Sequence, residues 1–185
     1  PDLLKVRNPY LRPQFTETFE LSFEHLWNAG SAIVSAYVRD IEDPFTRVFA
    51  IDPTNTDYDI INKIYQNVGG GSENGIELIL SQDFGSSWEL TGTINYYEKT
   101  IDADVVTLLF PVERPFVVNY SSDNTWDASI NNVVRLANGM DIQVAFSYYG
   151  DRNIAQGTQD ARSSFDVGFS MPVIDDRTEL TASVS

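Results

Sequence analysis

Apolar and polar side chains alternate along eight stretches of this chain, and a period of two is typical of β-strands. In the stretch 15–27, Phe19, Leu21 and Phe23 alternate with Glu20 and Ser22. Successive side chains of a strand point to opposite faces, so each stretch predicts one apolar and one polar face. The stretches are 15–27, 32–41, 64–84, 88–97, 126–136, 140–149, 163–171 and 178–185.

The connections between these stretches are short and long in turn. Short ones lie at 28–31, 83–87, 138–139 and 172–177. Long ones lie at 42–64, 98–124 and 150–162. In an antiparallel up-and-down barrel, this order places every long loop at one rim and every short turn at the other. A Greek-key sandwich gives no reason for such an order.

Two segments allow a second interpretation. Ile60, Ile61, Ile64 and Tyr65 also lie at helical spacing, so the segment 58–65 is either extended or one or two helical turns. The segment 105–120 is rich in Val, Leu and Phe but contains two prolines, and it is either a long loop or an extra hairpin within one. Neither outcome changes the order of the eight strands.

Composition excludes several classes of protein. The 185 residues include 12 basic and 27 acidic side chains, and the net charge of −15 would repel nucleic acid. No apolar run approaches the roughly 18 residues of a membrane-spanning helix, but strands of a membrane barrel are apolar only at every second position. The chain begins without Met and stops inside an alternating stretch, so we expect residues 1–185 to be part of one larger barrel domain, with its N-terminal strands, its closing strand and any plug lying elsewhere.

Aromatic residues gather near the ends of the strands. In a bilayer, two girdles of amphipathic rings lie at the headgroup level, and this favours a membrane barrel over a soluble sandwich, in which the rings would pack a core. The polar exceptions Glu17 and His25 lie near the two ends of the first stretch, whereas Asn132 lies mid-face and predicts a bulge or a different register. The predicted membrane-interface aromatics are Trp27, Tyr37, Phe84, Trp88, Tyr96, Trp126, Tyr148 and Phe165.

No motif for catalysis or cofactor binding stands out. His25 is the only histidine and cysteine is absent, so neither a histidine-based triad nor a multi-histidine or thiolate metal site can form. Gly69–Gly71 is not followed by the Lys and Ser/Thr of a phosphate loop and predicts a break or bulge in a long strand. We expect no enzymatic activity, no cofactor and no metal.

Two short motifs carry a resemblance to a known family. Asn8-Pro-Tyr-Leu-Arg-Pro13 runs into the first alternating stretch, and Asn67 is followed by Asn74-Gly-Ile-Glu77. These motifs resemble the later part of the barrel of TonB-dependent outer-membrane receptors and their relatives. The positions that carry the match are Asn8, Pro9, Leu11, Pro13, Glu20, Asn67, Gly75 and Glu77.

The resemblance implies a receptor in the outer membrane of a Gram-negative bacterium, with a plugged barrel of about 22 strands. Such a receptor imports a bulky nutrient such as a metal chelate, vitamin, glycan or peptide. Its partners are outer-membrane lipid, a TonB-type energy-coupling protein that acts through the plug, and in some cases a surface lipoprotein. Ligand contacts are then expected in the three long connections and on the polar strand face. The alternative is a secreted, soluble all-β binding module with carbohydrate as its candidate ligand.

Overall fold

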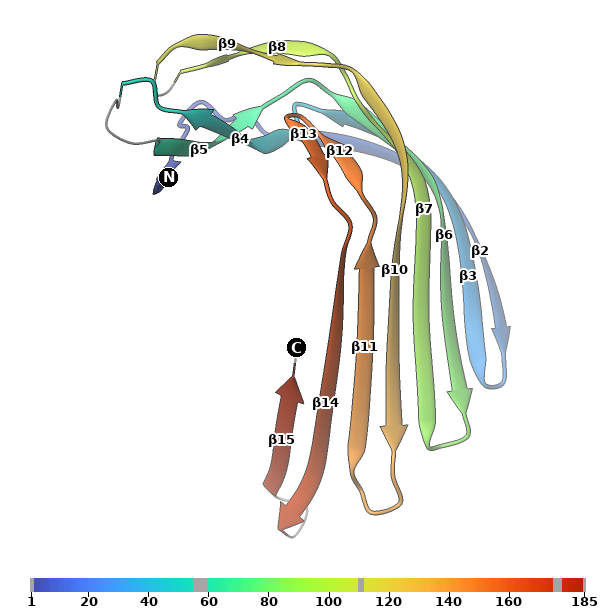
Figure 1. Ribbon diagram of the computed structural model, residues 1–185. Helices are drawn as coiled ribbons and strands as arrows, with labels where there is room; N and C mark the ends of the chain where they lie inside the picture. The colour runs from blue at the N-terminus through green and yellow to red at the C-terminus, as the bar shows by residue number, and fades with distance from the viewer. Residues whose placement is uncertain (1, 55–59, 110–111, 175–177, 185) are drawn as a thin grey trace.

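Eight long antiparallel strands form one curved sheet in the computed structural model, which describes residues 2–54, 60–109, 112–174 and 178–184 (Figure 1). In sheet order the strands are β2 (Phe15–Trp27), β3 (Gly30–Glu42), β6 (Gly71–Phe84), β7 (Trp88–Ile101), β10 (Ser121–Arg135), β11 (Asp141–Tyr149), β14 (Arg162–Ile174) and β15 (Thr178–Val184). This order confirms the predicted all-β, up-and-down fold. The sheet is not closed, because β2 and β15 each have one neighbour among the described residues.

Seven shorter strands accompany this sheet, six of them where the long connections were predicted and one near the N-terminus. A three-stranded sheet has the order β1 (Asp2–Val6), β5 (Ile60–Asn67) and β4 (Phe45–Ile51), with β1 parallel to β5. The segment 105–120 holds a hairpin of β8 (Asp104–Leu108) and β9 (Arg114–Val118), which is one of its two predicted outcomes. A small hairpin of β12 (Arg152–Ile154) and β13 (Gly157–Gln159) occupies the third connection.

Two local expectations for the first long connection need correction. The helical alternative for 58–65 is wrong over residues 60–65, which belong to β5, while 58–59 lie outside the described residues. The stretch 64–84 is two strands rather than one, and their separation at Val68–Gly70 confirms the break predicted around Gly69–Gly71. A Cβ on Gly69 would lie 2.7 Å from the Cβ of Asp104, so the chain can pass this point only with a glycine.

The Asn138–Gly139 turn joins β10 to β11 as predicted, but through a three-residue loop. The Gly139 amide donates to the Leu136 carbonyl at 2.9 Å, and Leu136 in turn donates to the Met140 carbonyl at 2.8 Å. Gly139 has a φ of 81°, and Asn138 is not among the non-glycine residues with positive φ. A glycine in the left-handed region that follows such a turn is common in three-residue hairpins.

The register aligns apolar side chains in rows across the sheet. One such row on the outer, convex face consists of Phe23, Val34, Leu78, Ile94, Ala128 and Tyr148. The predicted bulge or different register at Asn132 is wrong, because Asn132 pairs regularly with Leu90 and Val144. Its side-chain oxygen accepts a hydrogen bond from the Trp88 indole at 3.3 Å, which satisfies this polar group on the outer face.

The apolar band crosses the sheet obliquely. Its centre is Leu21 in β2 and Val167 in β14, and Val167 lies in the register row of Trp27, six positions further along β2 than Leu21. Since β14 is the sixth strand after β2, the band moves by one residue per strand. With a rise of about 3.4 Å per residue and a strand spacing of about 4.8 Å, strands in a level band would tilt by about 35°. This tilt agrees with that of membrane β-barrels.

The long connections lie at the upper end of the strands in Figure 1. The buried core lies at this upper end, between the β4–β5 strands and the β8–β9 hairpin. Val48, Ala50, Ile64 and Leu108 are at most 4% exposed, and Phe116 packs against them. The apolar side chains of the outer face stay exposed, with Phe19 at 75% and Ile94 at 52%. The sheet therefore presents a continuous apolar surface for which lipid is the matching environment.

None of the described residues forms a helix that is long and apolar enough to cross a membrane.

Candidate functional site

A belt of polar contacts lies on the inner, concave face and consists of Tyr37, Arg39, Glu73, Asn95 and Lys99. Tyr37 is its aromatic residue. Its side chain is only 5% exposed, its hydroxyl donates to Asn95 Oδ1 at 3.0 Å, and the Arg39 guanidinium lies 4.2 Å from its ring centre. The prediction of Tyr37 as a membrane-interface aromatic is wrong. Its neighbours Ala36 and Val38 point outward, so the period of two places Tyr37 inward.

The other seven predicted interface aromatics are on the outer face. Near the short turns, Phe84 and Trp88 stack with their ring centres 4.1 Å apart. Toward the long connections, Trp126 and Tyr148 stack at 4.3 Å. The two groups, at opposite ends of the strands, are Trp27, Phe84 and Trp88, and Tyr96, Trp126, Tyr148 and Phe165. Their contact with lipid headgroups stays a prediction.

Charged side chains continue the belt at the upper end of the inner face. The Glu73 carboxylate lies between two cations, 3.2 Å from Lys99 Nζ and 3.6 Å from Arg39 Nη1. These three residues are cross-strand neighbours on β3, β6 and β7. Because a guanidinium has five N–H donors and an ammonium has three, contact with Glu73 does not use all the donors of either cation.

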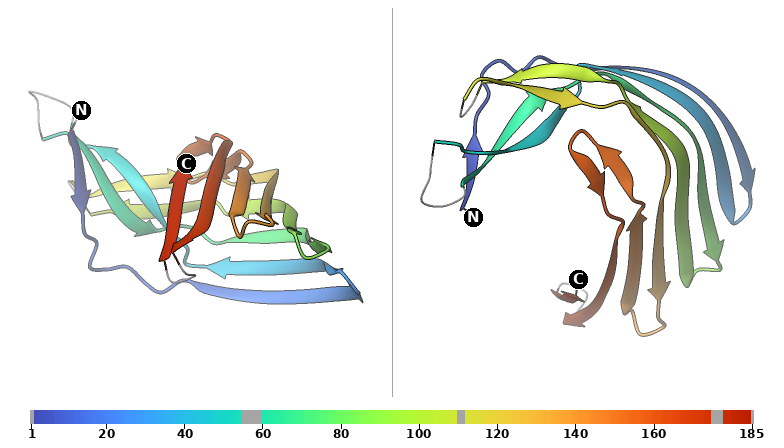
Figure 2. Two further views of the ribbon diagram at one scale, coloured as in Figure 1. Left: turned by 90° about the horizontal axis from the view of Figure 1, so that it is seen from below. Right: turned by 45° about the horizontal axis from the view of Figure 1, so that its top comes forward.

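The β12–β13 hairpin folds inward over this belt, under the arch of the sheet (Figure 2). At its base, Arg152 donates to Asp127 Oδ1 at 2.7 Å and to the Tyr97 hydroxyl at 2.9 Å. At its tip, the Gln156 side-chain amide pairs with both backbone groups of Phe49 in β4, at 2.7 and 2.9 Å. The hairpin is thus held at both ends, between the inner face and the upper three-stranded sheet.

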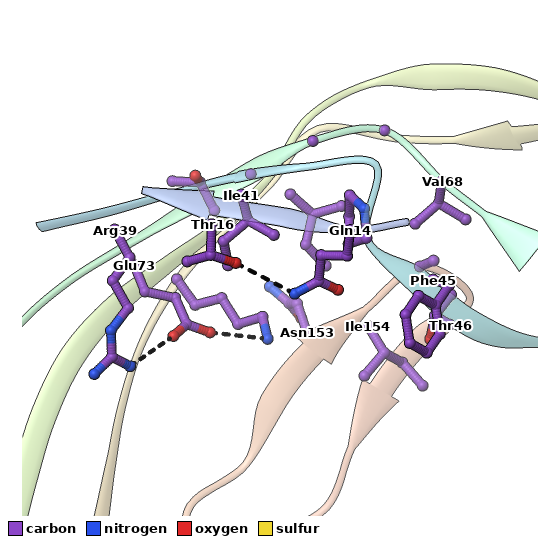
Figure 3. Close-up of a pocket in the computed structure, with 18 residues that line it drawn as sticks. Gln14, Thr16, Arg39, Ile41, Phe45, Thr46, Val68, Glu73, Asn153 and Ile154 are labelled. Carbon is purple, nitrogen blue, oxygen red and sulfur yellow. Dashed lines mark hydrogen bonds and ion pairs between the residues drawn. The ribbon is translucent and has the colours of Figure 1, made fainter. Parts of the chain in front are cut away.

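A cavity of about 520 Å³ lies between this hairpin and the upper ends of the strands (Figure 3). Arg39, Glu73 and Lys99 form its charged side, and Asn153 and Ile154 of the hairpin approach from the opposite side. The remaining lining residues are Gln14, Thr16, Ile41, Pro44, Phe45, Thr46, Val68, Gly69, Gly70, Gly71, Thr100, Ile101 and Ala155. Its size is typical of sites for small molecules.

The resemblance motifs come together beside this cavity. Asn67 Oδ1 accepts from the Arg12 amide at 2.8 Å, and Asn67 Nδ2 donates to the carbonyls of Arg12 and Asp43 at 3.0 and 2.7 Å. Asn8 Nδ2 donates to the Tyr65 carbonyl at 3.0 Å and to Gln66 Oε1 at 2.9 Å. Both asparagines therefore fasten the segment before β2 to β5.

The other motif positions have different surroundings. Pro9, Leu11 and Pro13 lie in the exposed segment that leads into β2. Glu20 accepts a hydrogen bond from the Ser22 hydroxyl at 2.8 Å. Gly75 and Glu77 lie on the inner face of β6, where Glu77 is flanked by Ser35 and Asn95.

Other polar groups of the upper sheet carry local contacts. Arg47 Nε donates to the Tyr65 hydroxyl at 2.9 Å, and this bond lowers the pKa of Tyr65. Hydrogen bonds from the Thr54 side chain and amide likewise lower the pKa of Asp52. Over the residues that the structure describes, no group of three or more His, Asp or Glu side chains is arranged to hold a metal ion.

The residues that shape the cavity did not stand out in the sequence. Arg39, Lys99, Arg152 and Gln156 belong to no motif and are up to 117 positions apart. The period of two along a strand could have placed Arg39 and Lys99 on the inner face, because their immediate neighbours in the sequence point outward. The inward fold of the β12–β13 hairpin has no such periodic signal.

The sheet has an oblique apolar band on its outer face, short turns at one rim and inward-folded connections at the other. These features define a wall of a bacterial outer-membrane β-barrel. The chain belongs to the outer membrane protein beta-barrel family, whose model matches residues 2–185. Searches of curated proteins and of solved structures gave no significant match. Family membership implies a location in the outer membrane of a Gram-negative bacterium, and barrels of this family are typically not enzymes.

Proposed function

We propose that the chain is part of the barrel of a TonB-dependent-receptor-like importer of a bulky nutrient. The observation that carries this proposal is the inward fold of the β12–β13 hairpin, which forms a cavity over the inner face at the long-connection rim. A receptor needs such a binding site at the end of the barrel that meets the ligand first. A general diffusion pore has no need of one.

The motif residues support the same function. Asn8 and Asn67 fasten the lead-in segment of β2 to the upper sheet, and Gly75 allows Tyr37 to lie flat on the inner wall. In this proposal these residues shape the ligand-facing end of the barrel. The nutrient classes that fit are a metal chelate, a vitamin, a glycan or a peptide, and the partners are a TonB-type coupling protein and a surface lipoprotein.

The exposed outer face argues against the alternative of a secreted, soluble binding module. In a soluble sandwich, a second sheet would cover the apolar face. Among the described residues no second layer covers Leu21, Ile94 or Phe165, which are 52–80% exposed. Partitioning of the full-length protein between detergent and buffer tests this alternative directly.

Energy-dependent uptake tests the proposed importer. Cells that express the full-length protein are given labelled candidates from the four nutrient classes, with and without a protonophore. We expect uptake of one class to need both the protein and the proton gradient, because TonB-type coupling draws on the inner membrane. Uptake that persists in the protonophore would indicate a passive pore and would contradict the proposal.

A further inference from the structure

We propose that the inner-face cavity binds an organic anion in which a carboxylate or phosphate is joined to a compact apolar group, with Arg39 and Lys99 as the charged contacts. This inference deepens the proposed import function and rests on it for its biological role. The observations that carry it are the placement of the two cations, the balance of charge along the inner face and the apolar wall opposite.

The two cations are positioned to meet an anion. The Arg39 guanidinium is stacked on the Tyr37 ring, and Lys99 is held 3.2 Å from Glu73, so both side chains are oriented before a ligand arrives. The side chains of Arg39 and Lys99 are 38% and 30% exposed, whereas Glu73 is 18% exposed. Asp123 follows Lys99 in the register but does not line the cavity. A guanidinium beside an ammonium is well suited to a carboxylate or phosphate.

The lining of the cavity carries two cations and one carboxylate, whereas the inner wall below it is acidic. Toward the short turns, the described inner face carries more acidic than basic side chains. The acidic ones are Glu20, Glu24, Glu77, Asp83, Glu89, Asp127, Asp141 and Asp166, and the basic ones are Arg135, Arg152 and Arg162. An anion is thus attracted to the cavity and repelled from the wall beyond it. This arrangement fits retention at a binding site rather than free permeation of anions.

Apolar side chains line another part of the cavity, beside the polar Gln14, Thr16, Thr46, Thr100 and Asn153, and they define the second half of the ligand. Ile41 and Ile101 lie at the ends of β3 and β7 and Val68 follows β5. Phe45 and Ile154 lie toward the opposite side (Figure 3). Gly69, Gly70 and Gly71 line the cavity with backbone alone, because an added Cβ at each would lie only 2.7, 3.0 and 2.3 Å from a neighbouring atom. A compact apolar group beside the anion would contact these residues.

Equilibrium dialysis with two matched probes tests the site. The full-length protein in detergent is dialysed against N-acetyl-leucine, which carries a carboxylate, and against N-acetyl-leucinamide, which is neutral. We expect the carboxylate to bind about tenfold more tightly, since a charge-assisted hydrogen bond is roughly twice as strong as a neutral one. Inorganic phosphate and added salt should compete. Equal affinity for the two probes would overturn the proposal.

Three variants separate a binding role from a structural one. Arg39→Gln and Lys99→Gln should each weaken carboxylate binding by about tenfold. Glu73→Gln removes the competing carboxylate and should strengthen binding several-fold, whereas a merely structural ion-pair cluster would lose binding in all three variants. Arg135→Gln is the control, because Arg135 pairs with Glu89 at 3.1 Å near the short turns. Heat-modifiable migration on gels checks that each variant folds.

The two proposals fail separately. Carboxylate preference without protonophore-sensitive uptake would leave the site intact and contradict the importer. Protonophore-sensitive uptake with no change in binding for Arg39→Gln, Lys99→Gln and Glu73→Gln would leave the importer intact and overturn the anion site. If Arg135→Gln weakens binding as much as Lys99→Gln, the effect is not local, and the site is likewise overturned.

Discussion

Tyr37 and Gly75 form a direct cross-strand pair in which the tyrosine ring covers the glycine. A Cβ built on Gly75 would lie 2.6 Å from the Tyr37 hydroxyl oxygen and 2.7 Å from the Cβ of Tyr97. The glycine therefore makes room for a ring that is nearly fully buried on the inner wall and that supports Arg39. An aromatic residue over a glycine on the adjacent strand also fixes the register of two strands.

Replacing Gly75 tests this relationship. Gly75→Ala should destabilise the barrel by about 1–3 kcal/mol, because the added methyl group forces Tyr37 or Tyr97 out of position. Urea unfolding of the full-length protein in lipid measures the change. Gly92→Ala on β7 is a matched control, since its Cβ would lie 3.9 Å from the nearest atom. Similar losses of unfolding free energy for both variants would contradict a specific role of the contact between Gly75 and Tyr37.

A pair of adjacent arginine substitutions tests which face meets lipid. Ile94 points outward and Thr93 inward, from the middle of the same strand. Ile94→Arg should cost about 2–4 kcal/mol near the bilayer midplane, whereas Thr93→Arg should be tolerated better on a wet inner face. The free energy of unfolding in lipid vesicles gives both values. Equal costs would contradict the assignment of faces.

The tip of the β12–β13 hairpin should loosen when Gln156 is truncated. Its two hydrogen bonds to the Phe49 backbone are worth about 1 kcal/mol each, so Gln156→Ala should speed local amide exchange by about tenfold or more. Hydrogen exchange followed by mass spectrometry over 45–51 and 152–159 measures this effect. Gln143→Ala, which removes a bond to Asn131 on the lower inner face, should leave those peptides unchanged.

Asn67 should be essential for the position of the lead-in segment. Asn67→Ala removes three hydrogen bonds from a side chain that is 6% exposed and leaves the partner groups on Arg12 and Asp43 unpaired. We expect a loss of about 2–4 kcal/mol in the upper sheet. Protease sensitivity of residues 7–14 in intact cells reports the release. Asn74→Ala, at an exposed outer position, serves as the control, and equal sensitivity in both variants would count against the clamp.

Period-two patterning predicted the long strands closely. The first strand begins at Phe15 and ends at Trp27 as expected, and the eight-strand order follows the alternation of short and long connections. The weaker results lie in the long connections. β4 and β5 show no clear alternation in the sequence, because β4 carries Phe45, Phe49 and Ile51 at exposed positions and β5 buries Asn62 and Asn67. The two-residue turn predicted at 138–139 is a three-residue loop, because Leu136 and Met140 pair across it through their backbone.

The candidate site shows the same division. Asn67, Gly75 and Glu77 were singled out from motifs, and the structure places them beside or below the cavity. Tyr37 was assigned to the wrong face because closeness to a strand end was given more weight than its parity in the strand. The cations of the cavity belong to no motif, since their significance arises from neighbouring strands that are far apart in the sequence.

The sequence by itself determined the strands, their two faces and their order, because these depend on periodicity and connection length, which are local properties of the chain. Only the tertiary structure decided what the upper rim contains. The inward β12–β13 hairpin, the contact of Gln156 with Phe49 and the sharing of Glu73 by Arg39 and Lys99 all join residues that are distant in sequence. Such contacts depend on the register and curvature of the whole sheet, and no local pattern encodes them.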